Sequence, residues 1–447
     1  MDILSLIPAV GGLLSTIVAF VVALSVIVAV HEYGHYIVGR WGGIKAEVFS
    51  LGFGPVLFSR VDKHGTRWQF AALPFGGYVK FLGDTNAASV GEDGEMVSDL
   101  TPAERRQTVQ GAPLWARTAM VAAGPAFNFV LSIIVFAIIG LTNGVVKSPL
   151  TVGEISVLPY EVSLQTNDEI VSIAGQEVPS FEESSFGLFL NTLPVEPELD
   201  FVVRRDGQEI AIKGPYPMAP IVSGLSPQSA AYDINMKVGD VITAVDGAEI
   251  FAFAQLKDAV LAADGKPLKL DVWRDGEVLE FVLAPRRIDE PLAEGGFQTT
   301  WRIGIVGGVL FDPATEPPGL WQAVKGGVLV MWNIVHSSIS GLYYMITGAI
   351  STCNMTGPIG IAQVSGAMAS QGTQSFVYFI GVLSTAVGLL NLFPIPVLDG
   401  GHLVFFGYEA VAGKPPSDRA MRVLMGIGLF VILSTMVFAL TNDLFCP

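Results

Sequence analysis

The sequence predicts a polytopic α-helical membrane protein with four transmembrane helices, a membrane-associated β-sheet and two β-rich domains outside the membrane. Three observations predict this fold class. Hydrophobic residues make up 51% of the 447 residues and charged residues only 15%, whereas ordinary soluble domains are about 25% charged. Four apolar stretches are long enough to cross a bilayer, which takes about 20 residues. Most of the net charge is concentrated in one long polar insert.

This polar insert is strongly acidic. Between residues 143 and 319 the chain carries 27 acidic and 12 basic side chains, so this part holds −15 of the total net charge of −16. Nucleic acids attract Lys and Arg through their phosphates, and the composition therefore excludes DNA and RNA as partners. The hydropathy instead predicts a lipid bilayer as a partner.

Four predicted spans account for the apolar composition: Gly12 to Val30, Ala119 to Leu141, Phe376 to Leu398, and Met421 to Leu440. No Lys or Arg precedes the first span, and the first basic residue of the chain is Arg40. The segment therefore lacks the positive region that opens a signal peptide. We predict a retained span whose N-terminus lies outside the membrane.

Basic residues indicate the orientation of the other segments. Nine Lys and Arg residues lie between the first two spans, and Lys414, Arg419 and Arg422 lie at the start of the last span. Cytoplasmic loops carry an excess of Lys and Arg. Both loops are therefore predicted to be cytoplasmic, which leaves the acidic insert on the outer side.

The loop after the first span has a β pattern. Within Ile44 to Gly83, four short runs rich in Val and aromatic residues are separated by Gly and Pro, which is typical of strands joined by turns. The runs are apolar for a loop. We therefore expect a small sheet that dips into the membrane, where non-helical backbone is tolerated if protein buries it or if it lines a cavity.

The acidic insert contains a weak internal repeat. Residues 167–175 (NDEIVSIAG) align with residues 238–247 (VGDVITAVDG), and each segment reads as a turn, an alternating strand and a second tight turn. Another strand and a charged hairpin follow each of them. Because such self-similarity indicates repeated structural units, we predict two β-rich domains, over residues 143–214 and 215–288.

The candidate chemistry begins at the end of the first span with His31-Glu32-Tyr33-Gly34-His35. On a helix, positions i and i+4 share a face, so both imidazoles can bind one Zn²⁺. Glu32 lies beside them, where it can take a proton from water. This motif also occurs by chance, but His and Glu are costly near a membrane span and are usually functional there.

A catalytic zinc site takes a third protein ligand, and the end of the third predicted span offers two candidates. Asp399 is the only acidic residue of this stretch, and carboxylate oxygens bind zinc well. Pro394 and Pro396 interrupt the helix just before it. His402, three residues further on, is the alternative ligand.

The two motifs together, HEYGH and NLFPIPVLDGG, resemble those of the site-2 protease family of metallopeptidases. The resemblance covers nearly the whole chain. It includes GFGP in the β segment, TGPIGIA at residues 356–362, and the two β-rich domains, which are similar to the PDZ-like pair of the bacterial branch, the regulator of sigma-E protease type. No catalytic position departs from the family pattern.

The resemblance implies an intramembrane zinc metalloendopeptidase. It implies His31, His35 and Asp399 as Zn²⁺ ligands and Glu32 as general base. It also implies that Asn391 lies near the scissile carbonyl, where a side-chain amide can stabilise an oxyanion. The implied partner is a single-span membrane protein, an anti-sigma factor already trimmed outside the membrane in an envelope stress pathway, with remnant signal peptides as a second class.

The resemblance and the charge pattern together give an expected location. We expect a multi-pass protein of the bacterial inner membrane, with the N-terminus and the PDZ-like domains in the periplasm and the active site near the cytoplasmic side. Neither PDZ-like domain has a clear GLGF-type loop. We therefore expect these domains to act as a size filter for substrates and not to capture peptides tightly.

A transmembrane substrate must unwind before it is cut, and its freed backbone groups then need partners. We expect an edge strand within Glu47 to Phe53 to pair with the unwound segment by strand addition. The residues expected to contact the substrate are Gly52, Phe53, Gly54 and Pro396.

A fifth apolar stretch, Leu320 to Ile350, is broken by polar residues and glycines. If it crossed the membrane, Asp399 would lie on the opposite face from the two histidines, so we predict a surface-lying amphipathic helix.

The predicted organisation is then a first transmembrane helix with HExxH (1–42), a β segment and cytoplasmic loop (43–117), a second transmembrane helix (118–142), two PDZ-like domains (143–214 and 215–288), an outer surface-lying region (289–373), a third transmembrane helix with the LDG motif (374–402), and a cytoplasmic loop with the fourth transmembrane helix (403–447).

Two other classes of function remain possible from the residues alone. A zinc-binding membrane scaffold would use the histidines but would not need Glu32. A transporter is expected to show more buried charge and inverted repeats. The presence of Glu32 between both histidines favours catalysis. Cys353 and Cys446 form no CxxC motif, and we expect neither a thiolate zinc site nor a disulfide.

Overall fold

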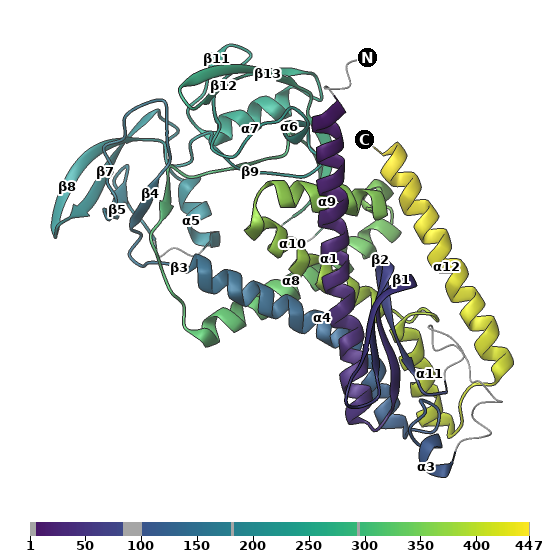
Figure 1. Cartoon of the computed structure of the whole chain (residues 1–447). Coiled ribbons are helices and arrows are strands. Elements are labelled where there is room, and N and C mark those ends of the chain that lie inside the picture. Colours follow the sequence, from purple (N-terminus) through teal and green to yellow (C-terminus); the bar gives the residue numbers. More distant parts are fainter. Residues whose placement is uncertain (1–5, 84–100, 180–182, 293–295, 447) are drawn as a thin grey trace. The chain divides into compact units, whose positions relative to one another are not determined.

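The computed structural model describes residues 6–83, 101–179, 183–292 and 296–446. The chain divides into two compact units, which are shown in Figure 1 and described separately below. The helical unit consists of Met1–Ile139, Trp321–Tyr343 and Met355–Cys446, and the β unit consists of Gly140–Leu320 and Tyr344–Asn354. Part of the predicted cytoplasmic loop, residues 84–100, lies outside the described residues.

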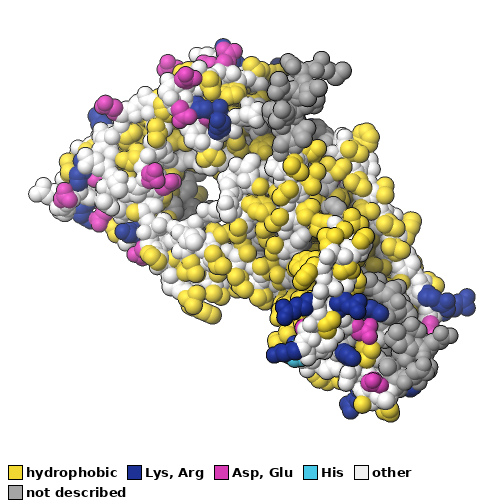
Figure 2. All heavy atoms as spheres, viewed as in Figure 1, with side chains coloured by type: hydrophobic (Ala, Val, Ile, Leu, Met, Phe, Trp, Pro, Cys, Tyr) yellow, Lys and Arg dark blue, Asp and Glu magenta, His cyan; other side chains and the backbone are white. Residues whose placement is uncertain are grey.

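Four described helices are long and apolar enough to cross a membrane: α1 (Leu6–Trp41), α4 (Leu114–Asn143), α10 (Thr373–Asn391) and α12 (Asp418–Phe445). Apolar side chains cover most of the helical unit on the face shown in Figure 2. On α12, for example, Phe430 is 71% exposed. A water-soluble protein rarely exposes apolar surface on this scale. The helices and the β-sheets together fit a polytopic membrane protein with β domains.

The third apolar helix is shorter than the sequence predicts. Helix α10 ends at Asn391, and the LDG sequence opens a separate helix, α11 (Asp399–Ala412). The assignment of residues 374–402 to a single transmembrane helix was therefore wrong, although the interruption at Pro394 and Pro396 was predicted. Pro394 and Pro396 have no backbone N–H and restrict the residues before them, so the chain leaves the helix and begins a new one at Asp399.

The remaining helices of this unit pack around the spans. Helix α9 (Pro358–Ser370) contacts α1, α10 and α12. Its first turn is capped by Asp443 of α12, whose carboxylate accepts hydrogen bonds from the N–H groups of Gly357, Ile359 and Gly360. Helix α8 (Leu320–Ile346) is not among the candidate spans of the described residues. The short α3 covers Pro102–Arg105.

The predicted β segment forms one long, bent hairpin of β1 (Ala46–Val61) and β2 (Arg67–Phe81). Its first half is a central strand, because Phe49 lies opposite Val79 on one side and opposite Trp68 on the other. The β character of this segment is confirmed, but the expected edge strand within Glu47 to Phe53 is wrong for Val48 to Leu51, because both sides of that stretch are already paired.

The β unit contains two four-stranded antiparallel sheets with equivalent strand orders, β6-β5-β7-β8 and β11-β10-β12-β13. The first sheet consists of β5 (Glu169–Ile173), β6 (Gln176–Glu177), β7 (Glu198–Arg205) and β8 (Gln208–Pro215). The second consists of β10 (Val241–Val245), β11 (Ala248–Glu249), β12 (Leu268–Arg274) and β13 (Glu277–Leu283). Helices α5 (Glu183–Leu190), α6 (Ala230–Asp233) and α7 (Phe253–Ala262) accompany them.

Strands that come late in the chain complete both halves of the β unit. Leu310 and Phe311 lie in the first hydrophobic core and Ile303 in the second. Residue 288 is therefore not the end of the second domain, and the assignment of residues 297–316 to a surface-lying region was wrong. The strands pair as β16 (Ile305–Gly307) with β9 (Val222–Leu225), β17 (Phe311–Pro313) with β4 (Val152–Ile155), β18 (Thr315–Glu316) with β3 (Val145–Val146), and β14 (Arg286–Pro291) with β15 (Phe297–Arg302).

Each sheet holds a buried carboxylate in the same way. Asp168 accepts two hydrogen bonds from Arg205, both 2.7 Å, and a third from the N–H of Gln165. Asp240 accepts two from Arg274, both 2.6 Å, and a third from a backbone N–H. Burial disfavours ionisation of Asp168, but its hydrogen bonds outweigh burial and hold the pKa below its ordinary value.

Neither cysteine is a free thiol. Cys353 and Cys446 are both disulfide-bonded, so the expectation of no disulfide was wrong. The two cysteines form no sequence motif, and whether they lie close enough for a disulfide depends on the folded chain.

Candidate metal centre

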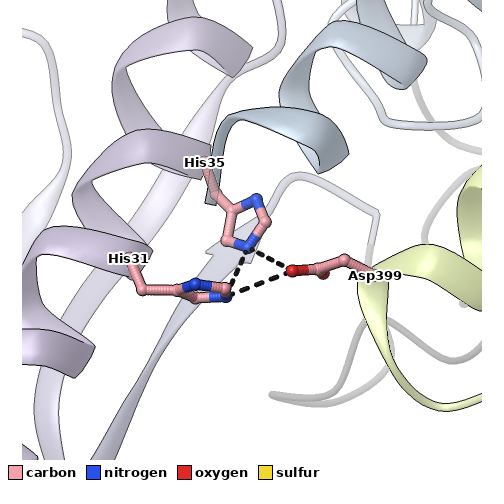
Figure 3. Close-up of side chains that lie close together, drawn as sticks. All are labelled: His31, His35 and Asp399. Atoms are coloured by element: carbon pink, nitrogen blue, oxygen red, sulfur yellow. Dashed lines mark hydrogen bonds and ion pairs between the residues drawn. The ribbon is translucent and has the colours of Figure 1, made fainter. Parts of the chain in front are cut away.

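Three side chains from distant parts of the sequence meet within the helical unit. His31 and His35 lie one turn apart on α1, and Asp399 is in the first turn of α11; their side chains point toward one another in Figure 3. The two Nε2 atoms are 3.1 Å apart. Oδ2 of Asp399 is 3.2 Å from Nε2 of His31 and 3.5 Å from Nε2 of His35.

These spacings suit a small tetrahedral cation. Zinc binds nitrogen and oxygen at about 2.0–2.2 Å, so two ligands of a tetrahedral site lie about 3.3 Å apart. The three observed separations, 3.1, 3.2 and 3.5 Å, are close to that value. Among the described residues, this is the cluster of His, Cys and acidic side chains that could hold a metal ion.

The surroundings of His35 and Asp399 leave lone pairs of these two residues facing the centre of the cluster. Nδ1 of His35 is 2.9 Å from the carbonyl oxygen of Met120 on α4, and because a carbonyl can only accept, Nδ1 carries the proton. In the neutral ring, Nε2 then presents its lone pair. Oδ2 of Asp399 is buried and receives no other hydrogen bond. Facing lone pairs of this kind are stabilised by a cation, so the donor set fits zinc.

Close helix packing places α4 directly over the imidazoles. A Cβ atom on Gly124 would collide with Nε2 of His35 and with Cε1 of His31. A Cβ atom on Gly34, between the histidines on α1, would lie 2.5 Å from the carbonyl oxygen of Ala123. Glycine at both positions lets the two helices approach closely enough for Met120 to reach His35.

Two glycines also position Asp399. A Cβ atom on Gly400 would meet the carbonyl oxygens of residues 392 and 393, and one on Gly401 would lie 2.6 Å from Cα of Pro396. Because Gly400 and Gly401 have no side chains, the first turn of α11 can pack directly against the loop that precedes it. Within that loop Val397 has φ of 110°, which is strained for a β-branched residue.

An ion pair joins the C-terminal part of α11 to α4. Arg117 donates two hydrogen bonds to Glu409, of 2.6 and 3.2 Å, and both side chains are largely buried. The Arg117 guanidinium also lies over the ring of Phe406, 5.3 Å from its centre. A bidentate pair of this kind fixes the orientation of both partners, so it holds the helix that carries Asp399 in register with the helix over the imidazoles.

Glu32 lies next to the cluster. Its carboxylate is half-buried and interacts electrostatically with His31, His35 and Asp399, and it accepts a hydrogen bond from the backbone N–H of Val79 in β2. A Cβ atom on Gly77 would lie 3.5 Å from Cγ of Glu32. The hairpin therefore forms one wall of the space beside the metal cluster.

Other residues with predicted roles lie outside this cluster. Nδ2 of Asn391 donates to the carbonyl oxygen of Val387 in its own helix, at 3.0 Å. Gly52, Phe53 and Gly54 form a bend of the hairpin, where Gly52 and Gly54 have positive φ and Phe53 stacks near Tyr78. Pro396 is in the loop before α11, and His402 is in α11, outside the three-residue cluster.

Sequence reasoning missed two contributors on α4: the carbonyl of Met120 and the space left by Gly124. A backbone carbonyl leaves no trace in a sequence. The GPAFN segment, residues 124–128, was a usable signal, because an Asn in a membrane span is costly and needs a partner. From the sequence, Asn128 is expected to hydrogen-bond another helix or the substrate, with helix packing favoured; in the structure its amide lies beside His31.

Comparison with known proteins agrees with the geometry. The family model "Peptidase family M50", the site-2 protease family, matches residues 19–435. A candidate zinc metalloprotease of Agrobacterium fabrum is 35% identical over 442 residues, which cover 98% of this chain and 97% of the relative. A regulator of sigma-E protease of Salmonella typhimurium is 31% identical, over 97% of this chain and 99% of the relative. The chain therefore belongs to peptidase family M50 and is a zinc-dependent metalloprotease with candidate membrane-spanning helices.

Proposed function

We propose that this protease cuts single-span membrane proteins within or near the membrane, with His31, His35 and Asp399 as zinc ligands. The observation that carries the proposal is the convergence of two imidazole nitrogens and one carboxylate oxygen on an apolar, membrane-spanning helix unit. A site built on such helices is accessible to a substrate that is itself in the bilayer.

Bound zinc supplies Lewis acidity, which polarises a peptide carbonyl and makes water a better nucleophile at neutral pH. Glu32 is the general base: its carboxylate takes a proton from the attacking water and passes it to the nitrogen of the leaving amine. Its hydrogen bond from the Val79 N–H holds the carboxylate in place. The hairpin and α4 enclose the reacting groups and limit access of bulk water.

The substrate contacts proposed from the sequence need one revision. The stretch Val48–Leu51 has partners on both sides, so we assign substrate contact to the bend at Gly52, Phe53 and Gly54, where Phe53 is 41% exposed. Pro396 is proposed to line the opposite side. Asn391 stabilises the carbonyl oxygen after its amide turns away from Val387.

We further propose that the two halves of the β unit are PDZ-like domains that lie in the periplasm. These domains exclude untrimmed substrates by their bulk. In this topology α8 lies on the outer membrane surface and the metal site is near the cytoplasmic side. Because β16 and β17 pair with early strands of the two halves, a deletion that removes both halves without leaving unpaired strands covers residues 146–316. This deletion variant should cut untrimmed substrate that the intact protease rejects. Rejection by the deletion variant would contradict the filter.

The name of one relative supports the proposed substrate class. One relative is named a regulator of sigma-E protease, which supports an anti-sigma factor, trimmed outside the membrane, as the substrate in envelope stress signalling. Remnant signal peptides are a second single-span class of suitable size.

The decisive experiment compares wild type with Glu32→Gln on a single-span model substrate, with bound zinc measured in both. General acid–base catalysis contributes about 10²–10⁴-fold, so cleavage should fall by at least about 100-fold while zinc stays bound. The substitution is nearly isosteric and leaves the three proposed ligands intact.

Glu47→Gln is the matched control, because Glu47 pairs with Lys80 on the same hairpin at 3.3 Å and does not belong to the metal cluster. It should cut at the wild-type rate. Cleavage by Glu32→Gln at that same rate would show that Glu32 is not the base. Zinc binding without cleavage in any protein, wild type included, would instead favour a zinc-binding scaffold.

A further inference from the structure

Asn128 is a fully buried polar side chain in α4, with 0% of its surface exposed. Its Nδ2 lies 3.2 Å from Nδ1 of His31, while its Oδ1 is buried without a hydrogen-bond partner. Its Cβ faces α10, because a Cβ atom on Gly388 would lie 3.2 Å from it. The amide is therefore enclosed between the metal cluster and a neighbouring helix.

The other buried polar groups of this interface join α4 to α10. Ser132, one turn beyond Asn128, donates to the carbonyl oxygen of Gly381 at 2.8 Å and contacts the hydroxyl of Thr385 at 2.5 Å. Ser384 donates to the backbone oxygen of Asn128 at 2.9 Å. These bonds account for helix packing without the Asn128 side chain, whose partner is a histidine.

The chemistry of a neutral imidazole decides how that amide is used. A ring that offers the Nε2 lone pair to a metal carries its proton on Nδ1, and this N–H needs an acceptor. An amide NH₂ group can only donate, whereas the amide oxygen can only accept. A half-turn of the amide exchanges Oδ1 and Nδ2, which are similar in size. It gives the Nδ1–H of His31 an acceptor and gives Oδ1 a partner.

We propose that Asn128 is a positioning residue for the metal site: its side-chain oxygen accepts the Nδ1–H of His31 and turns the Nε2 lone pair of that ring toward the metal. The carbonyl of Met120 does the same for His35. Both imidazoles are thus oriented from α4. The inference rests on the proposed function, in which His31 is a zinc ligand, and extends it by assigning the group that orients this ligand.

The test measures zinc affinity of the detergent-solubilised full-length protein by competition with a chromophoric chelator. Asn128→Leu keeps the volume but removes the acceptor, and should weaken zinc binding about 10–100-fold, as loss of such partners does elsewhere. Asn128→Asp restores an acceptor oxygen and should bind zinc within a few-fold of wild type. The thermal unfolding temperature of each metal-free protein reports packing separately.

Ser132→Ala is the matched control, because it removes a buried hydrogen-bonding group of the same helix face that touches no histidine. It should lower the unfolding temperature without changing zinc affinity. Equal zinc affinity in Asn128→Leu and wild type, or an equal loss in Ser132→Ala, would overturn the proposal. If Asn128→Leu does not fold, Asn128→Ala binding zinc as tightly as Asn128→Asp would overturn it.

The parent proposal fails in a different way. If His31→Ala binds zinc as tightly as wild type, His31 is not a ligand and the proposed function is wrong. If His31→Ala loses zinc while Asn128→Leu retains it, only the positioning role of Asn128 is wrong.

Discussion

Asp168 in the β unit and Asp399 in the helical unit are both largely buried carboxylates, with 1% and 17% of their side-chain surfaces exposed. Their surroundings differ. Asp168 receives three hydrogen bonds, from a guanidinium and a backbone N–H. Asp399 turns an oxygen toward two imidazole nitrogens, at least one of which also presents a lone pair.

The difference separates a structural carboxylate from one that is available to a ligand. Where donors saturate both oxygens, burial is compensated within the protein and the group stabilises its own domain. Where acceptors converge without donors, the local arrangement is favourable only with a cation. The number of donors around a buried carboxylate thus distinguishes the two roles better than burial does.

The largest expected effect comes from Asp399→Ala. Loss of an outer-shell partner already weakens metal binding about 10–100-fold, so loss of a ligand should weaken zinc binding by more than about 100-fold. Cleavage of a single-span substrate should fall to background. Zinc per chain after dialysis against a chelator, with the cleavage rate, measures both. Wild-type zinc content in Asp399→Ala would show that Asp399 is not a zinc ligand.

A smaller and different effect is expected from Asp168→Ala. The Gln165 N–H loses its acceptor, at a cost of about 1–3 kcal/mol to the first sheet, with zinc affinity and cleavage unchanged. Because the folded state lowers the pKa of Asp168, its stabilisation is complete above the unfolded value of about 3.9. It is lost as pH falls through the folded pKa, so wild type and variant should converge in acid.

Amide hydrogen exchange in β5 and β7 measures this loss locally. Asp240→Ala is the matched control, since it breaks the equivalent ion pair and should accelerate exchange in β10 and β12 instead. Glu198→Ala breaks an exposed pair with Lys213 and should change exchange least, because exposed ion pairs contribute little. A loss of zinc on replacing Asp168 would contradict its purely structural role.

Much of the metal site could be predicted because part of it is local. His31, Glu32 and His35 lie within two turns of one helix, so helical spacing alone puts both imidazoles on one face. Asp399 is remote in sequence, and the residues alone left His402 as an alternative until the family resemblance favoured Asp399. The ligand roles themselves stay predictions until zinc binding is measured in the variants.

The parts that could not be predicted depend on non-local contacts. Strands β16 and β17 have three residues each, too few for a periodic pattern, and their partners lie much earlier in the chain. Phe49 acquired neighbours on both sides because β2 bends around it, which no alternation pattern indicates. Pro394 and Pro396 did predict a break, but the sequence did not show that a new helix starts at Asp399.

The distance in sequence between the histidines and Asp399 has a consequence for biogenesis. The ribosome completes α1, with HExxH intact, long before it reaches residue 399 of 447. A nascent or truncated chain that ends earlier contains the base and two nitrogen donors but lacks the oxygen that completes the cluster. Under the proposed ligand set, such a product lacks one of the three zinc ligands, and we expect it not to cleave substrate.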